Sequence, residues 1–319
     1  MADIRPKDLA NTATSPTDDD FLLLDGATAG TRKILGSRFS LEPAESWTEL
    51  WTRTSPGAGE WDAYTTGSPA AALSPWGMGD AGAGTLTATL QQEATSGERR
   101  HLVEWSNLAV GSNLPKGAPN LTIGWHDYYE SDPNPFKTGS TRGIESSTIE
   151  SLKASVRWST ADHPVGLFYA GAIQSYLYFT SYTGDAFGGQ TGIDLQIIGP
   201  WAQFPAWSDF NNRVATEVAF GPYIFDVYRS ATTNMGGSNH SYSFLPARTA
   251  REMSVAPPYY EYVDLDFLAV VNWVRTTHNS FATRSDTSYF FRTLQAWVEP
   301  LSGSGQVDIT GLSIDMELV

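Results

Sequence analysis

The clearest pattern in the chain is a regular alternation of apolar and polar residues at its C-terminus, broken once at Gly311. Side chains in a strand point alternately to its two faces, so this pattern predicts a strand with one buried face, and a bulge at Gly311 would restore the register. Residues 293–300 and a Ser/Gly turn at residues 302–305 precede it, which predicts a terminal hairpin. The alternating residues are Val307, Ile309, Leu312, Ile314, Met316 and Leu318, with Asp308, Thr310, Ser313, Asp315 and Glu317 between them.

From Glu45 onward, short runs rich in Thr, Val, Tyr and Trp are separated by clusters of Gly, Pro, Asn and Asp. Such runs are typical of strands joined by turns. They cover residues 84–90, 101–105, 155–158, 167–169, 175–179 and 193–198. We therefore predict an all-β chain whose body, residues 41–319, is one large jelly-roll-like β-sandwich. The closing pattern is similar to the last strands of carbohydrate-binding jelly rolls.

Three other segments of the body carry weaker patterns. Residues 146–154 predict a short helix capped by serines. Residues 264–275 are apolar enough for a buried helix, but their valines favour a strand, which is our prediction. Residues 55–84 are rich in Gly, Pro and Ala and predict a long excursion over the surface.

The first forty residues have a different character. Residues 1–20 are polar, with two prolines and a run of three aspartates, and predict an extended segment. Residues 21–24 and 31–35 are short strand candidates on either side of turn signals, which predicts a hairpin. A lone hairpin is marginally stable in water, so it would need a partner surface; the alternative is an ordinary edge hairpin of the body. Residues 36–44 predict a short linker.

Residues 4–9, 15–20 and 21–34 together resemble the N-terminal anchoring segment of bacteriophage fibre and spike proteins, and of head spikes on gene transfer agents. The resemblance implies that residues 1–40 dock on capsid or tail proteins of a particle made in the bacterial cytoplasm, and that the body reaches the host surface. It also implies a homo-oligomer, a trimer in a tail fibre or a pentamer at a capsid vertex. The anchoring residues would be Phe21, Leu22, Leu23, Leu24, Asp25, Gly26, Thr31, Arg32, Lys33 and Ile34.

The composition of the chain limits the classes of partner that it is expected to bind. A formal net charge of −15 over 319 residues argues against binding to nucleic acid or an anionic membrane. No apolar run approaches the length of a membrane span, and we expect no membrane insertion. There is no cysteine, which excludes disulfides and thiolate metal sites. Only 17% of the residues are charged, and this favours a polar, aromatic surface suited to glycans.

Three aromatic clusters are candidate carbohydrate-binding sites. An aromatic ring can stack on a sugar while a nearby carboxylate accepts hydrogen bonds from its hydroxyls. In one strand, alternate residues share a face, so the first cluster is expected to present its members together. Each cluster has a structural alternative, either a buried ring at a strand end or packing between subunits. The clusters are Trp125, Asp127 and Tyr129; Tyr259, Tyr260 and Tyr262; and Trp201 and Trp207.

Little in the sequence points to catalysis, because no nucleophile elbow, zinc-binding helix or phosphate loop is present. Asp18, Asp19 and Asp20 are a candidate Ca²⁺ site or a solvated turn; no other cofactor or metal is expected. We therefore predict a structural spike or fibre protein of a phage or phage-like particle that binds host polysaccharide without covalent chemistry. The alternatives are a capsule depolymerase or lyase, with His126 and Tyr128 as candidate bases, and a purely structural head-decoration or baseplate protein.

Overall fold

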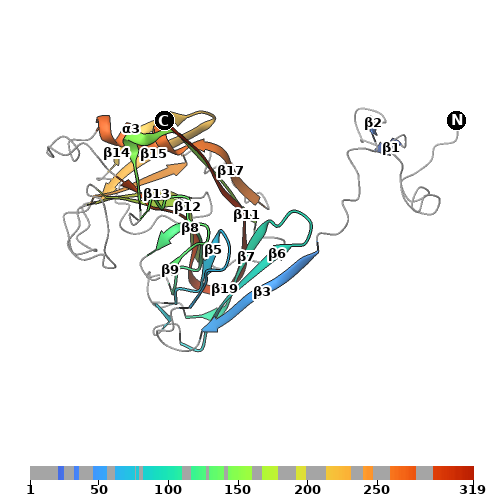
Figure 1. Ribbon diagram of the computed structural model, residues 1–319. Helices are drawn as coiled ribbons and strands as arrows, with labels where there is room; N and C mark the ends of the chain where they lie inside the picture. Colours follow the sequence, from blue (N-terminus) through green and yellow to red (C-terminus); the bar gives the residue numbers. More distant parts are fainter. Residues whose placement is uncertain are drawn as a thin grey trace. The chain divides into compact units, whose positions relative to one another are not determined.

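The computed structural model describes residues 21–24, 32–35, 46–55, 62–75, 77–78, 82–109, 116–126, 129–139, 143–159, 167–178, 192–198, 213–230, 240–246, 259–277 and 290–319. The chain divides into two compact units, Met1–Ser46 and Trp47–Val319 (Figure 1). The sequence prediction had placed this boundary at residue 40.

The first unit contains the predicted hairpin. Strands β1 (Phe21–Leu24) and β2 (Arg32–Leu35) pair antiparallel, with Phe21 opposite Leu35 and Leu24 opposite Arg32. Of the predicted anchoring residues, Asp25, Gly26 and Thr31 lie outside the described residues. The same holds for the aspartate run at 18–20 and the predicted linker at 36–44. That this hairpin anchors the chain to a particle stays a prediction.

The second unit is a sandwich of two β layers, as predicted. In the described part of the chain, six antiparallel strands form one layer, which we call the six-stranded layer. In spatial order they are β3 (Trp47–Ser55), β6 (Thr85–Glu93), β7 (Arg99–Leu108), the C-terminal half of β19 (Thr293–Leu318), β11 (Ile149–Ser159) and β17 (Tyr259–Asp266).

Nine strands form the other layer, the nine-stranded layer, again counted over the described residues. Their order is β4 (Ala63–Tyr64), β5 (Ala70–Ala72), β8 (Asn120–His126), the N-terminal half of β19, β12 (Leu167–Tyr178), β13 (Gly192–Ile198), β16 (His240–Pro246), β15 (Tyr223–Ser230) and β14 (Arg213–Phe220). Only the β13–β16 pair among these is parallel. The short strands β9 (Tyr129–Glu130), β10 (Ile144–Glu145) and β18 (Phe290–Phe291) extend it.

Alternation along the strands builds the core between the two layers. In the middle of β6 and β7, and on both sides of the layer crossing in β19, alternate side chains are apolar and buried, and residues on β8 and on the N-terminal half of β19 face them from the other layer. Burying such side chains is the main stabilising term of a sandwich. The core includes Leu86, Ala88, Leu90, Val103, Val307 and Ile309 from the six-stranded layer, and Leu121, Ile123, Leu294, Ala296 and Val298 from the nine-stranded layer.

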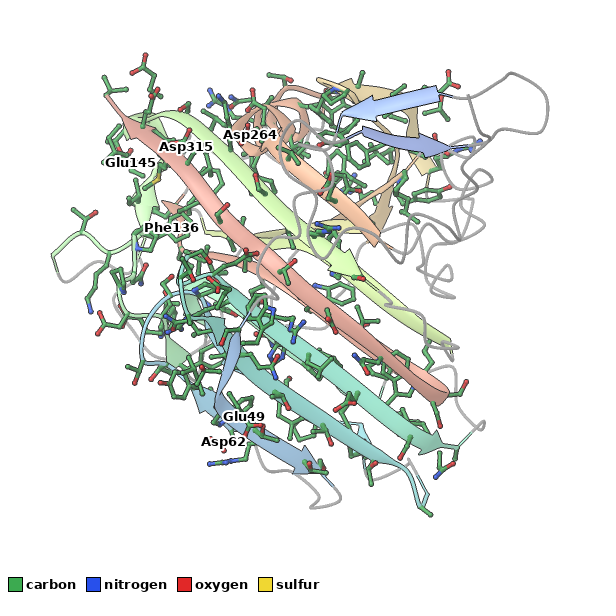
Figure 2. All side chains as sticks on the ribbon, turned by 90° about the vertical axis from the view of Figure 1, so that its right-hand side faces the viewer. Glu49, Asp62, Phe136, Glu145, Asp264 and Asp315 are labelled. Atoms are coloured by element: carbon green, nitrogen blue, oxygen red, sulfur yellow. The ribbon has the colours of Figure 1, made fainter. Side chains whose placement is uncertain are left out.

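Strand β19 belongs to both layers. Up to Ser302 it pairs with β8 and β12. From Gly303 onward it pairs with β7 and β11 and lies between them (Figure 2). The predicted turn at residues 302–305 was therefore wrong. The positive φ of Gly303, +74°, accompanies a crossing between layers and not a chain reversal. The bulge predicted at Gly311 is confirmed by its φ of +62° and by the register shift against Ser155 and Arg157.

Two local predictions also need correction. Residues 264–275 do not form a strand: β17 ends at Asp266 and helix α3 (Phe267–Thr277) follows, with the Asp266 carboxylate accepting a hydrogen bond from the Ala269 amide at 2.8 Å. Residues 146–154 are not an α-helix, since a single 3₁₀ turn (Ser146–Thr148) leads directly into β11. Across the described residues, no helix has the length and apolar character needed to cross a membrane.

The predicted surface excursion over residues 55–84 is also corrected in part. Ala70, Ala71 and Ala72 form strand β5 and are fully buried. Their small side chains let β5 pack closely beside β8, where Ala70 lies opposite Thr122. Alanine is a weak strand former, and this is why composition alone misplaced the segment.

Candidate functional site

The face of the nine-stranded layer that points away from the core carries a group of buried polar side chains, which we call the central polar cluster: Asn120, Thr122, Tyr129 and Gln295. Gln295 Nε2 donates to Thr122 Oγ1 at 2.9 Å, and Thr122 Oγ1 donates to Asn120 Oδ1 at 2.8 Å. The Tyr129 hydroxyl also donates to Asn120 Oδ1. The cluster is thus internally satisfied, as a buried polar network must be.

Two further glutamines lie in backbone register with Gln295 across the centre of the layer. Gln295 of β19 lies opposite Gln174 of β12, and Gln174 lies opposite Gln196 of β13. Three glutamines therefore follow one another in a single row over three adjacent strands. Of the three, the structure describes the side chain of Gln295, which is buried at 3% exposure.

Beyond Gln295, strand β19 brings a carboxylate to the same face. Leu294, Ala296 and Val298 point into the core, so Gln295, Trp297 and Glu299 point away from it. Trp297 is 5% exposed and packs with Leu301, while Glu299 between them is half-buried. In register, Glu299 lies opposite Tyr169 of β12. The sequence reasoning missed Glu299 and Gln295; their alternation with core residues was the available signal.

The indole of Trp297 leaves a donor unused beside Glu299. Its Nε1 is buried and has no hydrogen-bond partner. The register explains this, because the residues on either side of Trp297 are Gly171, which has no side chain, and Asn120. Asn120 Nδ2 donates to the Ala118 carbonyl at 2.8 Å, and its Oδ1 accepts within the cluster.

The predicted cluster of Trp125, Asp127 and Tyr129 does not form a common aromatic face. Strand β8 ends at His126, and β9 folds back on it with Trp125 opposite Glu130 and His126 opposite Tyr129. Trp125 and Tyr129 therefore lie on opposite faces of a tight hairpin, and Asp127 lies outside the described residues. Trp125 is 3% exposed, with Arg292 Cζ at 4.0 Å from its ring centroid, so its ring offers no stacking surface.

The other predicted aromatic residues are placed as follows. Tyr262 is 1% exposed and packs in the core against Trp158 and Tyr223, with ring centroids 6.1 and 5.0 Å away. Tyr259 and Tyr260 are the first two residues of strand β17. Trp201 and Trp207 lie outside the described residues. Among the predicted residues whose side chains the structure describes, only Tyr129 belongs to the central polar cluster.

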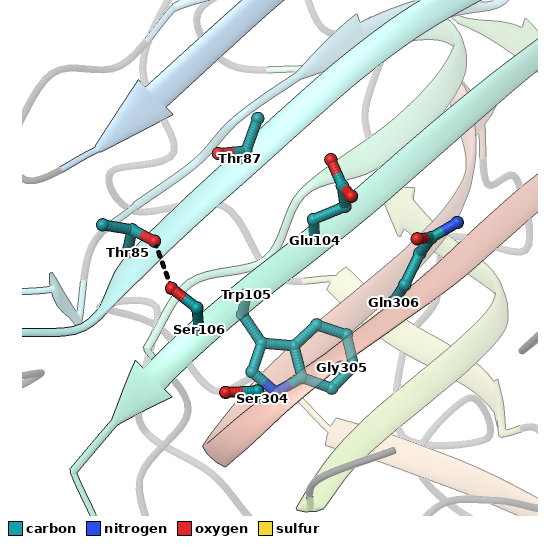
Figure 3. Close-up of a pocket in the computed structure, with 8 residues that line it drawn as sticks. All are labelled: Thr85, Thr87, Glu104, Trp105, Ser106, Ser304, Gly305 and Gln306. Atoms are coloured by element: carbon teal, nitrogen blue, oxygen red, sulfur yellow. Dashed lines mark hydrogen bonds between the residues drawn. The ribbon is translucent and has the colours of Figure 1, made fainter. Parts of the chain in front are cut away.

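A concave feature lies on the outer face of the six-stranded layer, on the opposite side of the sandwich from the central polar cluster (Figure 3). We call this feature, of about 460 Å³, the outer hollow. Strands β6, β7 and β19 supply its lining: Thr85, Thr87, Glu104, Trp105, Ser106, Ser304, Gly305 and Gln306. In the described part of the chain, no group of three or more His, Asp or Glu side chains is placed to hold a metal ion.

No protein-family model matches the chain, and no curated protein matches it in sequence. Solved structures do match. A metagenome-derived glycoside hydrolase family 12 endoglucanase has a TM-score of 0.59 at 12% identity, covering 86% of this chain and 100% of its own. Endoglucanase Cel12A from Rhodothermus marinus gives 0.59 at 12%, covering 84% and 100%. A family 12 xyloglucanase from Bacillus licheniformis gives 0.57 at 16%, covering 83% and 100%. The fold is that of glycoside hydrolase family 12.

This comparison corrects the predicted function. The sequence predicted a structural spike or fibre that binds polysaccharide without cleaving it, with a lyase or a purely structural protein as alternatives. The solved structures that share the fold are glycoside hydrolases, including endoglucanases and xyloglucanases. The aromatic residues that suggested passive glycan binding are, where the structure describes their side chains, buried in the sandwich.

Proposed function

We propose that the chain is a glycoside hydrolase that cleaves internal bonds of a neutral β-glucan, with Glu299 as the acid that protonates the leaving oxygen. The observation that carries the proposal is the half-buried Glu299 carboxyl group on the polar face of a family 12 sandwich. The neighbours in fold support the substrate class, since they include an endo-1,4-β-glucanase and xyloglucanases.

The chemistry assigns a defined role to Glu299. The bond between the anomeric carbon and the glycosidic oxygen breaks, and its electron pair stays on the oxygen, which takes the Glu299 proton. Water supplies the hydroxyl group that ends on the anomeric carbon, and its other proton restores the acid. The central polar cluster and the Trp297 indole flank Glu299, and these groups are of the kind that orients sugar hydroxyls.

A second carboxyl group normally lies about 5 to 9.5 Å from the acid in such enzymes. Strands β8 and β12, which flank Glu299, carry no Asp or Glu, and β13 carries Asp194. Asp194 lies opposite Tyr176, whereas Glu299 lies opposite Tyr169. At about 3.3 Å per residue this register separates the two acidic residues by roughly 20 Å along the strands. The second carboxyl group would then come from outside these three strands.

The experiment measures new reducing ends after incubation with soluble 1,4-β-glucan and xyloglucan oligosaccharides. Glu299→Gln keeps the size and hydrogen-bonding capacity of the side chain but removes the acid, so kcat should fall by about 10²- to 10⁴-fold while oligosaccharide affinity changes little. Glu150→Gln, an exposed position on β11 in the six-stranded layer, is the matched control and should retain activity. Equal activity of Glu299→Gln and the parent chain, or no cleavage of any β-glucan, would refute the proposal.

A further inference from the structure

A row of hydrogen-bonding side chains crosses the outer face of the six-stranded layer. The register places Thr54 opposite Thr87, Thr87 opposite Glu104, and Glu104 opposite Gln306. Adjacent strands lie about 4.8 Å apart, so the row offers polar groups at a regular spacing over four strands. The last three of these residues line the outer hollow.

Hydroxyl groups within the row and beside it are hydrogen-bonded to one another. Thr54 and Thr87 hydroxyls lie 2.9 Å apart, and those of Thr85 and Ser106 lie 2.7 Å apart (Figure 3). In the described part of the chain, the exposed carboxylate of Glu104 makes no hydrogen bond or ion pair, although it stands at the centre of the row. Such a group is free to accept hydrogen bonds from a ligand.

A glycine, Gly305, lines the hollow next to Trp105. A Cβ atom at Gly305 would lie 2.5 Å from Trp105 Cζ2, because the buried indole of Trp105 fills the space against this residue. Trp105 is fixed there by its Nε1, which donates to the Ser302 carbonyl at 3.4 Å. The absent side chain of Gly305 makes room for the Trp105 indole, and both residues contribute to the lining of the hollow (Figure 3).

We propose that the outer hollow binds a neutral polysaccharide strand, separately from the face that carries Glu299. Its polar lining consists of hydroxyl, amide and carboxylate groups, and none of its lining residues is a cation. A free carboxylate accepts hydrogen bonds from sugar hydroxyls and repels anionic polymers, and the net charge of −15 acts in the same direction. The volume of about 460 Å³ lies within the range of small-ligand sites. Such a site would keep the protein bound to the polysaccharide and would catalyse no reaction.

The test is affinity electrophoresis through gels that contain hydroxyethyl cellulose, with every protein carrying Glu299→Gln so that the polymer stays intact. Removing two ligand-facing groups with Glu104→Ala/Gln306→Ala should weaken retention about tenfold. Glu150→Ala/Ser313→Ala removes two exposed polar groups from the same layer outside the hollow and should leave retention unchanged. Retention in carboxymethyl cellulose, an anionic polymer, should be weaker for the parent.

Equal retention of the hollow variant and its parent would overturn the proposal, as would an equal loss in the control. Equal retention of the parent in the neutral and anionic gels would overturn the assignment to neutral polymers. Circular dichroism of both double variants establishes that they are folded. The readout is retention and not cleavage, so failure of the hollow proposal is distinguishable from failure of the assignment of Glu299 as the catalytic acid.

Discussion

His101 is a histidine that the sandwich buries completely, stacked on Trp51 with ring centroids 6.5 Å apart. Neither ring nitrogen makes a hydrogen bond of normal geometry. Burial lowers the pKa of His101 to about 3, and the backbone of Ala72 opposes this shift only in part. Below about pH 6.5 this histidine binds a proton in the unfolded chain, whereas in the folded chain it stays neutral until near pH 3. The folded state therefore loses stability as the pH falls through this window.

This predicts a specific loss of stability in mild acid. Between pH 7 and pH 4, His101 should lower the free energy of unfolding by roughly 3 kcal/mol. His101→Phe keeps an aromatic ring against Trp51 but cannot be protonated, and the drop over this interval should be smaller by about that amount. Urea unfolding at both pH values, followed by tryptophan fluorescence, measures the difference. An identical drop in both proteins would show that His101 is not the titrating group.

At the residue scale, the sequence contains no local motif that marks the candidate site. Glu299 is one acidic residue within an apolar strand, and no local spacing marks it as functional. Only the pairing of β19 with β8 and β12 brings Gln295, Thr122 and Asn120 together with it. In contrast, Trp125 and Tyr262 stand out in sequence because they are aromatic, yet the fold uses their rings for packing.

At the scale of elements, two glycines with positive φ allow two costs of an alanine substitution to be distinguished. One is backbone strain, and the other is steric overlap with a neighbouring strand. Gly124 in β8 has a φ of +98°, and a Cβ atom there would overlap the Arg292 carbonyl oxygen of the neighbouring strand segment. Gly311 in β19 has a φ of +62°, but the atom nearest to an added Cβ there is 3.8 Å away, at the end of Glu98. Gly311→Ala should therefore cost about 1 kcal/mol from strain alone.

Gly124→Ala adds overpacking to the same strain and should cost about 2 to 4 kcal/mol, because β8 and the segment before β19 have to separate. Chemical denaturation of both variants measures the two losses under the same conditions. Equal losses would contradict the idea that the close approach of these backbones, and not φ alone, fixes glycine at position 124.

Most strands were predictable because their signal is local alternation, as in β6, β7 and β11 and the C-terminal half of β19. Two segments were predicted wrongly because their structure depends on neighbours that are distant in sequence. Ala70–Ala72 form a core strand because β8 lies beside them, and residues 302–305 continue a strand because their pairing partners change there. In α3, the buried Phe267, Val270, Val271 and Val274 do follow helical spacing, but the β preference of valine outweighed that pattern in the prediction.

At the scale of the whole molecule, β19 is the strand on which the sandwich depends. It lies inside both layers and pairs with β8 and β12 in one and with β7 and β11 in the other. These pairings join residues far apart in sequence and cost much loop-closure entropy, so they form only as the whole sandwich forms. The N-terminal unit, Met1–Ser46, is a compact unit of its own.

This division predicts the result of two truncations. Residues 47–319 alone should fold, keep the melting temperature of the full chain within about 3 °C, and cleave oligosaccharides at the same rate if Glu299 is the acid. Removing residues 303–319 instead takes the central strand from the six-stranded layer and should abolish cooperative unfolding. Thermal melts followed by near-ultraviolet circular dichroism distinguish these outcomes. If residues 47–319 fail to fold while the full chain does, the first forty-six residues are part of the sandwich and the predicted anchoring role is lost with that independence.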